Sequence, residues 1–338
     1  MYHSRFKGNY YEAGYKWGAR VLKNKGSISN CHMFLITEER KSFSEECMPL
    51  YKKFYPEILE EIRGIAESQN IPYKDLCTFL MSMYCFEFNN KCTCFVVKNK
   101  NDIIFGRNSD FLVELEKLYD SCFYKMENSF SFVGNTTAFT QIEDGINEYG
   151  LAVGLTFIYP KIRKPGLNAG MLVRYILEKC KTVKEAVQEL KRIPIASAQT
   201  LTIADKFGEM AVIECNPEKL VEIYPNKKQN FVLAVNNFYS DEMKEFTNPN
   251  RIDDWKSEER YKTVFTTLKE NSANFSFKTA QELLSGKYGF ICQYDRKKGG
   301  DTVWSCIYIL NEKKIYRSEG NPARKKFKED KRLKFTEI

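Results

Sequence analysis

A cysteine, a cation, an amide and a carboxylate are spaced so that a single β-hairpin could bring them together. Cys92 starts an apolar run typical of a strand, and a polar turn and a second apolar run follow it. Arg107, Asn108 and Asp110 come directly after that second run. Folding the hairpin would place these groups at one end of a sheet, where a cation can lower the pKa of the thiol. The spacing indicates a nucleophilic cysteine, although a buried strand followed by a turn would give the same pattern.

A nucleophilic cysteine needs a proton acceptor, and histidine is scarce in this chain. The two histidines, His3 and His32, precede Cys92, whereas a papain-like pair takes its histidine from well after the cysteine. A papain-like peptidase is therefore a weak alternative. The α-amino group of Cys92 would serve if the chain were cut after Lys91, because an N-terminal amine has a pKa of about 7.7–8.0 and can activate a nucleophile.

The elements that must position these groups are predicted from the periodicity of apolar residues. Residues 1–91 read mostly as helix, with helices expected over 43–68 and 72–86. Beyond them, strands and helices come in blocks with several hairpins, which favours mostly antiparallel sheets flanked by helices. The prediction is an α+β fold with a helical N-terminal segment, 1–91, and a catalytic core, 92–338.

Composition excludes several classes of protein. The 338 residues are 43% hydrophobic and 28% charged, as in ordinary globular proteins and unlike disordered, collagen-like or coiled-coil chains. The longest nearly apolar run, 79–86, is far below the roughly 20 residues of a membrane helix, and the first 30 residues carry no secretory signal. Eleven cysteines without a CxxC pair predict reduced, buried thiols in a cytoplasmic protein, with no metal site.

The net charge of +8 is unevenly distributed, because half of it lies in the basic tail from about residue 321 to the end. This tail is expected to be solvated and partly frayed, or to contact an anionic ligand or nucleic acid. Aromatic side chains do not interleave with it as a single-strand-binding surface requires. A nucleic-acid-binding protein is therefore only a rival interpretation, and neither nucleic acid nor a membrane is an expected partner.

The segment around Cys92 resembles the N-terminal-nucleophile (Ntn) hydrolases of the isopenicillin N acyltransferase (acyl-coenzyme A:6-aminopenicillanate acyltransferase) family, related to choloylglycine hydrolases. That family carries Cys-Thr at a strand start and Gly-Arg-Asn-x-Asp-Phe on the return strand. Here these are residues 92–93 and 106–111, with Asp110 18 positions after Cys92. Further similar segments follow in order at 8–18, 144–154, 182–186, 204–214, 235–238 and 257–261.

The resemblance implies a four-layer αββα sandwich of two mostly antiparallel sheets, preceded by a helical pro-segment. It implies self-cleavage between Lys91 and Cys92, although the family's acyltransferases carry Gly before the cysteine. The freed cysteine would form an acyl-enzyme with a linear amide or thioester and pass the acyl group to water or an amine. The small and large subunits would stay associated, with no cofactor, or with acyl-coenzyme A as acyl donor. The alternative is a catalytically silent, uncleaved relative that binds acyl compounds.

The resemblance also implies roles for individual side chains around the nucleophile. Asp110 would hold the α-amine of Cys92, and Arg107 would favour the thiolate. The acyl group, its acceptor and the oligomeric state, a homo-oligomer included, are left open by the sequence.

Two asparagines and a second arginine complete the implied site. Asn236, and with it Asn147, would donate N–H groups to the oxyanion, and Arg260 would brace Asp110 or these donors. Each asparagine could instead be a turn or strand-end residue, and Arg260 an exposed helix charge. Cys94 is expected to be a core residue on the strand face opposite Cys92.

Overall fold

The computed structural model of the protein describes residues 1–24, 26–29, 34–86, 91–137, 139–226, 229–248 and 253–336. The described strands form two sheets. The eight-stranded sheet contains, in spatial order, β1 (Arg5–Gly8), β4 (Asp120–Met126), β5 (Phe132–Thr136), β6 (Asp144–Asn147), β7 (Ala152–Phe157), β8 (Gln199–Ala204), β9 (Met210–Cys215) and β10 (Leu220–Ile223). The six-stranded sheet contains β11 (Phe231–Ala234), β2 (Lys91–Lys98), β3 (Ile103–Leu112), β12 (Gly300–Ile309), β13 (Lys314–Ser318) and β14 (Lys328–Glu329). Neighbouring strands are antiparallel except β1 and β4.

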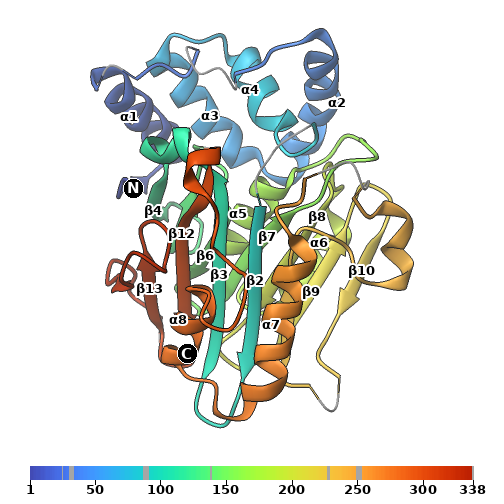
Figure 1. Cartoon of the computed structure of the whole chain (residues 1–338). Helices are drawn as coiled ribbons and strands as arrows, with labels where there is room; N and C mark the ends of the chain where they lie inside the picture. The colour runs from blue at the N-terminus through green and yellow to red at the C-terminus, as the bar shows by residue number, and fades with distance from the viewer. Residues whose placement is uncertain are drawn as a thin grey trace.

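The two sheets face each other, and helices cover both outer faces (Figure 1). On the eight-stranded sheet lie α5 (Ala169–Lys179) and α6 (Val183–Arg192), and on the six-stranded sheet lie α7 (Ser257–Asn271) and α8 (Phe277–Leu284). Buried apolar side chains from both sheets form a core between them. This four-layer αββα arrangement confirms the predicted fold class.

Four of the described helices precede β2 and lie over one end of the sandwich, at the top of Figure 1. They are α1 (Tyr10–Lys23), α2 (Glu38–Phe54), α3 (Pro56–Gln69) and α4 (Tyr73–Ser82). The prediction of one helix over 43–68 is wrong, because the helix is interrupted at Tyr55, whose φ of −149° is not helical. Pro56 explains the break, since proline lacks an N–H and disfavours helical geometry in the residue before it. Short 3₁₀ helices elsewhere are η1 (Val113–Leu118), η2 (Asp241–Phe246), η3 (Ser272–Asn274) and η4 (Arg296–Lys298).

Buried charges fasten the N-terminal helices to the core. Arg174 of α5 forms a two-pronged pair with Glu61 of α3, with N–O distances of 2.8 and 2.6 Å, and both side chains are buried. Tyr10 of α1 donates to Glu178 of α5 at 2.8 Å. Removing one partner of such a pair leaves a buried charge uncompensated. The N-terminal segment is therefore built into the fold, and its release as a separate piece would expose these charges.

The basic C-terminal segment, 321–336, packs against the core. Leu333 is buried among side chains of both sheets. Arg332 donates to the backbone oxygen of Ser121 at 2.7 Å. The expectation of a frayed tail is wrong for these residues, because acceptors distant in the sequence bind Arg332, whereas the expectation of a solvated tail holds for its lysines, which are exposed.

The described residues include no membrane-spanning helix and most of the cysteines. Among these residues, no helix combines the length and the hydrophobicity that crossing a bilayer requires. The ten cysteines within the described ranges are buried thiols and form no disulfide with one another. His32 lies outside the described residues.

Candidate active site

The β2–β3 hairpin brings the predicted nucleophile and cation together. Cys92 pairs with Ser109 across the hairpin, and Cys94 pairs with Arg107. The guanidinium of Arg107 reaches along the sheet, and its Nη2 lies 2.8 Å from the Sγ of Cys92. The hairpin and the contact expected from the spacing are therefore both present.

Cys94 corrects one detail of the sequence interpretation. It is buried in the core between the sheets, on the same side of β2 as Cys92. Side chains two positions apart on a strand project from the same face, so the expectation of opposite faces was wrong. The facing strand leaves room here, because a Cβ at Gly154 would lie 2.9 Å from the Cδ of Arg107 and 3.2 Å from the Sγ of Cys94.

Two carboxylates hold the Arg107 guanidinium in place, and sequence reasoning assigned neither of them a role. Asp144 accepts from Nη1 at 2.7 Å, and Glu143 lies 3.4 Å from Nη2. The backbone oxygen of Leu155 accepts from the same guanidinium at 3.1 and 3.2 Å. All three charged side chains are fully buried. The signal that could have found them is a pair of adjacent acids of which the second, Asp144, is the first residue of β6.

Asp144 anchors Arg107 more firmly than Glu143 does. Besides Arg107, four neighbouring side chains donate to its two oxygens, at distances from 2.6 to 3.1 Å. They belong to Asn135, Trp304, Cys306 and Tyr308. Glu143 instead accepts from Ser109 at 3.1 Å and from Thr137 at 2.5 Å. Asp144 thus fixes the guanidinium, and Glu143 links it to the loop after β5.

The electrostatic surroundings keep the Cys92 thiol protonated in the uncut chain. Burial raises the pKa of the thiol well above its usual range. Arg107 is the largest opposing influence and lowers it, whereas Glu143 and Asp110 raise it further. A neutral thiol needs a proton acceptor to become a nucleophile. The contact with Arg107 alone does not supply one.

Asn236 and Arg260 hold the backbone of Cys92 from the other side. The backbone N–H of Cys92 donates to the Oδ1 of Asn236 at 2.8 Å. Arg260 donates from Nη1 to the backbone oxygen of Cys92 at 2.6 Å and from Nη2 to Asn236 Oδ1 at 3.0 Å. The Nδ2 of Asn236 donates to the backbone oxygen of Phe157 at 2.8 Å. Arg260 is fully buried, so it is not an exposed helix charge.

Asp110 lies at the same end of the sheet, opposite Lys91 in the β2–β3 register. Its oxygens accept from Tyr294 at 2.9 Å and from Thr302 at 2.6 Å, and Arg260 lies 3.9 Å away. Burial raises the pKa of its carboxyl to about 6, against the lowering influence of Arg260. The Cys92 N–H donates to Asn236, and the expected hold of Asp110 on a free Cys92 amine stays a prediction.

The structure does not bring Asn147 to the Cys92 cluster. Both N–H groups of its side-chain amide are donated to backbone oxygens near the end of α5, to Leu177 at 3.0 Å and Cys180 at 2.7 Å. Its Oδ1 accepts from the backbone N–H groups of Tyr149 and Leu151, each at 3.1 Å. These contacts match the alternative of a turn residue, here one that ties the β6–β7 turn to a helix.

Lys91, at the expected cleavage point, is buried to 2% exposure. Its Nζ lies 5.7 Å from the ring centroid of Phe157. Burial lowers the pKa of its ammonium to about 8, and Arg260 contributes to the lowering. Lys91, which stands where the family's acyltransferases carry glycine, thus lies in an environment that disfavours its positive charge.

Replacing Lys91 should stabilise the uncut chain at neutral pH. The pKa of about 8 lies below the ordinary 10.5, so keeping the lysine protonated in the fold costs about 3 kcal/mol below pH 8. We expect Lys91→Met, in a Cys92→Ala background, to raise the free energy of unfolding by about that amount at pH 7. The gain should fade as the pH rises from 8 through 10.5, where the lysine is neutral in both states.

Denaturant titrations at pH 7 and at about pH 10.5 would check this expectation. Lys331→Met is the matched control, because its side chain is 78% exposed and should change stability by less than about 0.5 kcal/mol. Equal stabilities of the Lys91 variant and its parent at pH 7 would contradict the expected cost of burying the ammonium.

A metal centre is not evident in the described ranges, where His, Cys, Asp and Glu side chains form no group of three or more placed to hold an ion. The cluster offers instead a thiol, two guanidinium groups and an amide around one strand end. This set can deliver a nucleophile and stabilise negative charge on an oxygen.

Comparison with solved structures gives several partial matches. A mutant of the conjugated bile acid hydrolase from Clostridium perfringens is 15% identical, with 73% of this chain and 98% of that chain covered and a TM-score of 0.49. The Caenorhabditis elegans ortholog of N-acylethanolamine-hydrolyzing acid amidase is 22% identical, with coverages of 65% and 93% and a TM-score of 0.49. Penicillin V acylase from Agrobacterium tumefaciens is 15% identical, with coverages of 73% and 100% and a TM-score of 0.44. The four-layer arrangement is established by the strands and helices of this chain itself.

The sequence itself was compared with curated proteins and with protein families. No curated protein matches the chain significantly. The sequence model of one family matches residues 97–324, which is more than half of the chain and includes Arg107 and Asn236, although it begins five residues after Cys92. The chain therefore belongs to the acyl-coenzyme A:6-aminopenicillanic acid acyl-transferase family.

Proposed function

We propose that the chain is a self-cleaving cysteine amidohydrolase or acyltransferase in which Cys92 is the nucleophile. The observation that carries the proposal is the placement of Cys92 at the start of β2, with Arg107 on its thiol and Asn236 on its backbone N–H, each at 2.8 Å. Family membership supports acyl chemistry on an amide or thioester. The single strand end supplies the groups for both the cleavage and the later reaction.

The cleavage step begins with attack of the Cys92 thiol on the carbonyl carbon of Lys91. The C–N bond of the peptide breaks, its nitrogen takes up the proton that the thiol loses and becomes the α-amine, and a thioester joins the Lys91 carbonyl to sulfur. Water then hydrolyses the thioester, which leaves a carboxylate on Lys91 and a free thiol and amine on Cys92. Arg260 lies 2.6 Å from the Cys92 backbone oxygen and holds the strand end during this step.

The mature reaction uses the α-amine of Cys92 as the proton acceptor. The thiol gives its proton to the amine, and its sulfur attacks the acyl carbonyl of an amide or thioester substrate. The leaving amine or thiol takes that proton, and water or a second amine then releases the acyl group from sulfur. Asp110, whose oxygens already accept two hydrogen bonds, is proposed to hold the ammonium form.

Asn236 is proposed as the oxyanion donor, and Asn147 supplies the matched control. Asn236→Ala should lower kcat by about 10²–10³ with little change in KM, because an oxyanion donor acts chiefly in the transition state. Asn147→Ala should lower stability and leave kcat nearly unchanged, since its amide binds the end of α5. Rates should be normalised to the amount of cut chain determined by mass, so that slow cleavage is not counted as slow turnover. Equal losses of kcat in the two variants would contradict the assignment.

Trapping of an acyl-enzyme tests the proposed function directly. The purified chain would be mixed with a panel of aliphatic and aryl acyl p-nitroanilides and thioesters and quenched in acid. We expect an added acyl mass on the piece that contains Cys92, removable by hydroxylamine as a thioester should be. Turnover that survives alkylation of Cys92 would overturn the proposal.

Several finer expectations remain part of the proposal. They are a cytoplasmic location, a division at residue 91 with both pieces retained, and acyl-coenzyme A as an alternative acyl donor. The contacts of Arg174 with Glu61 support retention of the N-terminal piece, because they would survive cleavage. An uncleaved relative that only binds acyl compounds is the competing function, and Lys91 at the cleavage point favours it.

A further inference from the structure

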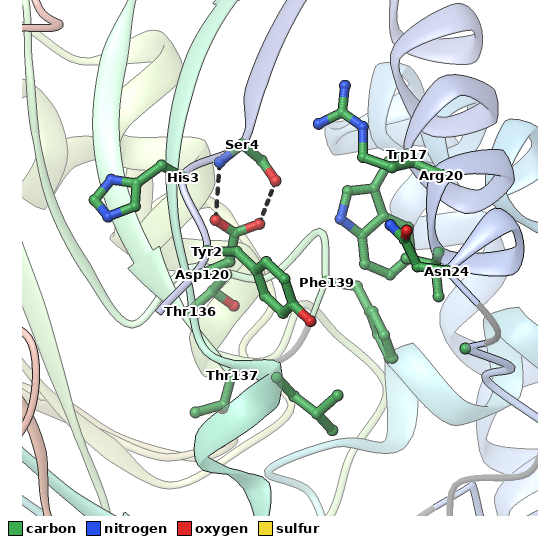
Figure 2. Close-up of a pocket in the computed structure, with 13 residues that line it drawn as sticks. Tyr2, His3, Ser4, Trp17, Arg20, Asn24, Asp120, Thr136, Thr137 and Phe139 are labelled. Carbon is green, nitrogen blue, oxygen red and sulfur yellow. Dashed lines mark hydrogen bonds between the residues drawn. The ribbon is translucent and has the colours of Figure 1, made fainter.

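A pocket of about 320 Å³ lies where the N-terminal segment meets the core (Figure 2). Its apolar wall comes from both parts of the chain, with side chains from the residues before β1, from α1, from η1 and from the loop after β5. These are Tyr2, Trp17, Val21, Leu118 and Phe139. The rings of Trp17 and Phe139 meet edge to face, with centroids 5.0 Å apart. Such a wall favours an apolar chain or ring.

A second, smaller hollow of about 180 Å³ adjoins the first and shares Trp17 and Arg20 with it. Cationic side chains dominate its lining: Arg5 and Lys7 from β1, and Lys16 and Arg20 from α1. One of these cations is already paired, because Lys16 lies 3.2 Å from Glu12. Several cations around one hollow attract an anion, and arginine suits phosphate and carboxylate groups in particular.

One carboxylate, Asp120, also lines the larger pocket, but it is already engaged. Its two oxygens accept from the backbone N–H of Ser4, at 3.0 Å, and from the Ser4 hydroxyl, as Figure 2 shows. Asp120 is 6% exposed, whereas the cations lie at the second hollow. The two hollows therefore differ in character, one apolar and one cationic, and they meet at Trp17 and Arg20.

The larger pocket also borders the Cys92 cluster. Thr137 lines it and donates to Glu143 at 2.5 Å. The other oxygen of Glu143 lies 3.4 Å from the Nη2 of Arg107, and that same Nη2 lies 2.8 Å from the thiol of Cys92. An occupant that moves Thr137 or Glu143 would change the charge that the thiol experiences.

We propose that the two adjoining hollows form one binding site for an amphipathic anion, a molecule with an apolar chain or ring and a phosphate or carboxylate head. The apolar part lies between Trp17 and Phe139, and the head contacts Arg5, Lys7 and Arg20. The site is separate from the acyl chemistry at Cys92 and does not depend on it. Thr137 and Glu143 lie between this site and Arg107.

Calorimetric titration of the full purified chain tests the site with simple probes. The probes are decyl phosphate, decanoate and decyltrimethylammonium, which share one chain length and differ in the head, each used below its micelle concentration. We expect one decyl phosphate or decanoate per chain, at least about tenfold tighter than decyltrimethylammonium, with the difference shrinking at high salt. The ratio of the affinities for the two anionic probes shows whether the site prefers a phosphate or a carboxylate head.

Variants assign the binding to the two hollows. Arg20→Ala should weaken the anions at least about tenfold and leave the cation unchanged, whereas Trp17→Ala should weaken all three probes. Arg63→Ala, which removes an exposed arginine of α3 outside both hollows, is the control and should change nothing. Trp17→Phe keeps an aromatic wall and should retain most of the affinity. It is the variant to measure if Trp17→Ala folds poorly.

Three results would overturn the proposal. They are equal affinities for the anionic and cationic probes, unchanged affinities in both Arg20→Ala and Trp17→Ala, and binding to anionic vesicles without binding to monomeric probe. Because all of these are binding measurements, they stand even if Cys92 never cleaves the chain, and acyl-enzyme trapping stands even if no anion binds.

Discussion

Denaturing mass spectrometry of the purified wild-type chain should show two pieces, residues 1–91 and residues 92–338, whereas Cys92→Ala should give a single uncut chain. The reason is that cleavage requires a thiol at the residue after the broken bond, and alanine offers no nucleophile. Acyl-enzyme formation should disappear in the same variant, with a loss of turnover of at least about 10⁴-fold, as is typical when a covalent nucleophile is removed. N-terminal sequencing of the larger piece should begin at Cys92.

Cys94→Ala is the matched control for this expectation. Cys94 is two positions along β2, projects from the same face and is equally buried. The Cys94→Ala variant therefore loses a buried thiol just as Cys92→Ala does, but its chain should still be cleaved. An uncut wild-type chain would remove the proposed amine base and favour the silent relative. Cutting that persists in Cys92→Ala would assign the cleavage to another protease.

Loss of the Arg107 guanidinium should destabilise the fold strongly. Arg107→Met leaves the buried carboxylates of Glu143 and Asp144 without their cation, and breaking a buried pair in this way typically costs about 3–5 kcal/mol. The measurement is denaturant unfolding in the Cys92→Ala background, where the chain stays in one piece. The methionine keeps most of the volume, so the loss reports charge and hydrogen bonding more than packing.

Two further variants separate this cause from a general loss of packing. Arg192→Met removes a cation from an exposed pair with Glu189 and should change stability by about 0–1 kcal/mol. Adding Asp144→Asn to Arg107→Met should recover part of the stability, because one unpaired buried charge is then removed. A double variant no more stable than Arg107→Met alone would show that the carboxylate charge is not what destabilises it.

Much of the fold could be predicted from the sequence because its signals are local. The strands of the β2–β3 hairpin are two apolar runs that lie close together in the sequence, and the short polar turn between them makes them pair with each other. The break between α2 and α3 also had a local signal in Pro56, which the helical periodicity around it concealed. The packed tail had none, because the acceptor for Arg332 is the distant Ser121.

The sequence by itself determined that Cys92, Arg107 and Asp110 share one strand end, since a hairpin leaves few alternative arrangements. Only the tertiary structure separated the two asparagines, because each lies in a segment that resembles the family, and the sequence favoured Asn236 without excluding Asn147. Asn236 reaches Cys92 across 144 positions of sequence, and Asn147 is turned to a helix end. That choice depends on how the two sheets pack face to face, and packing depends on contacts between segments that no local pattern relates.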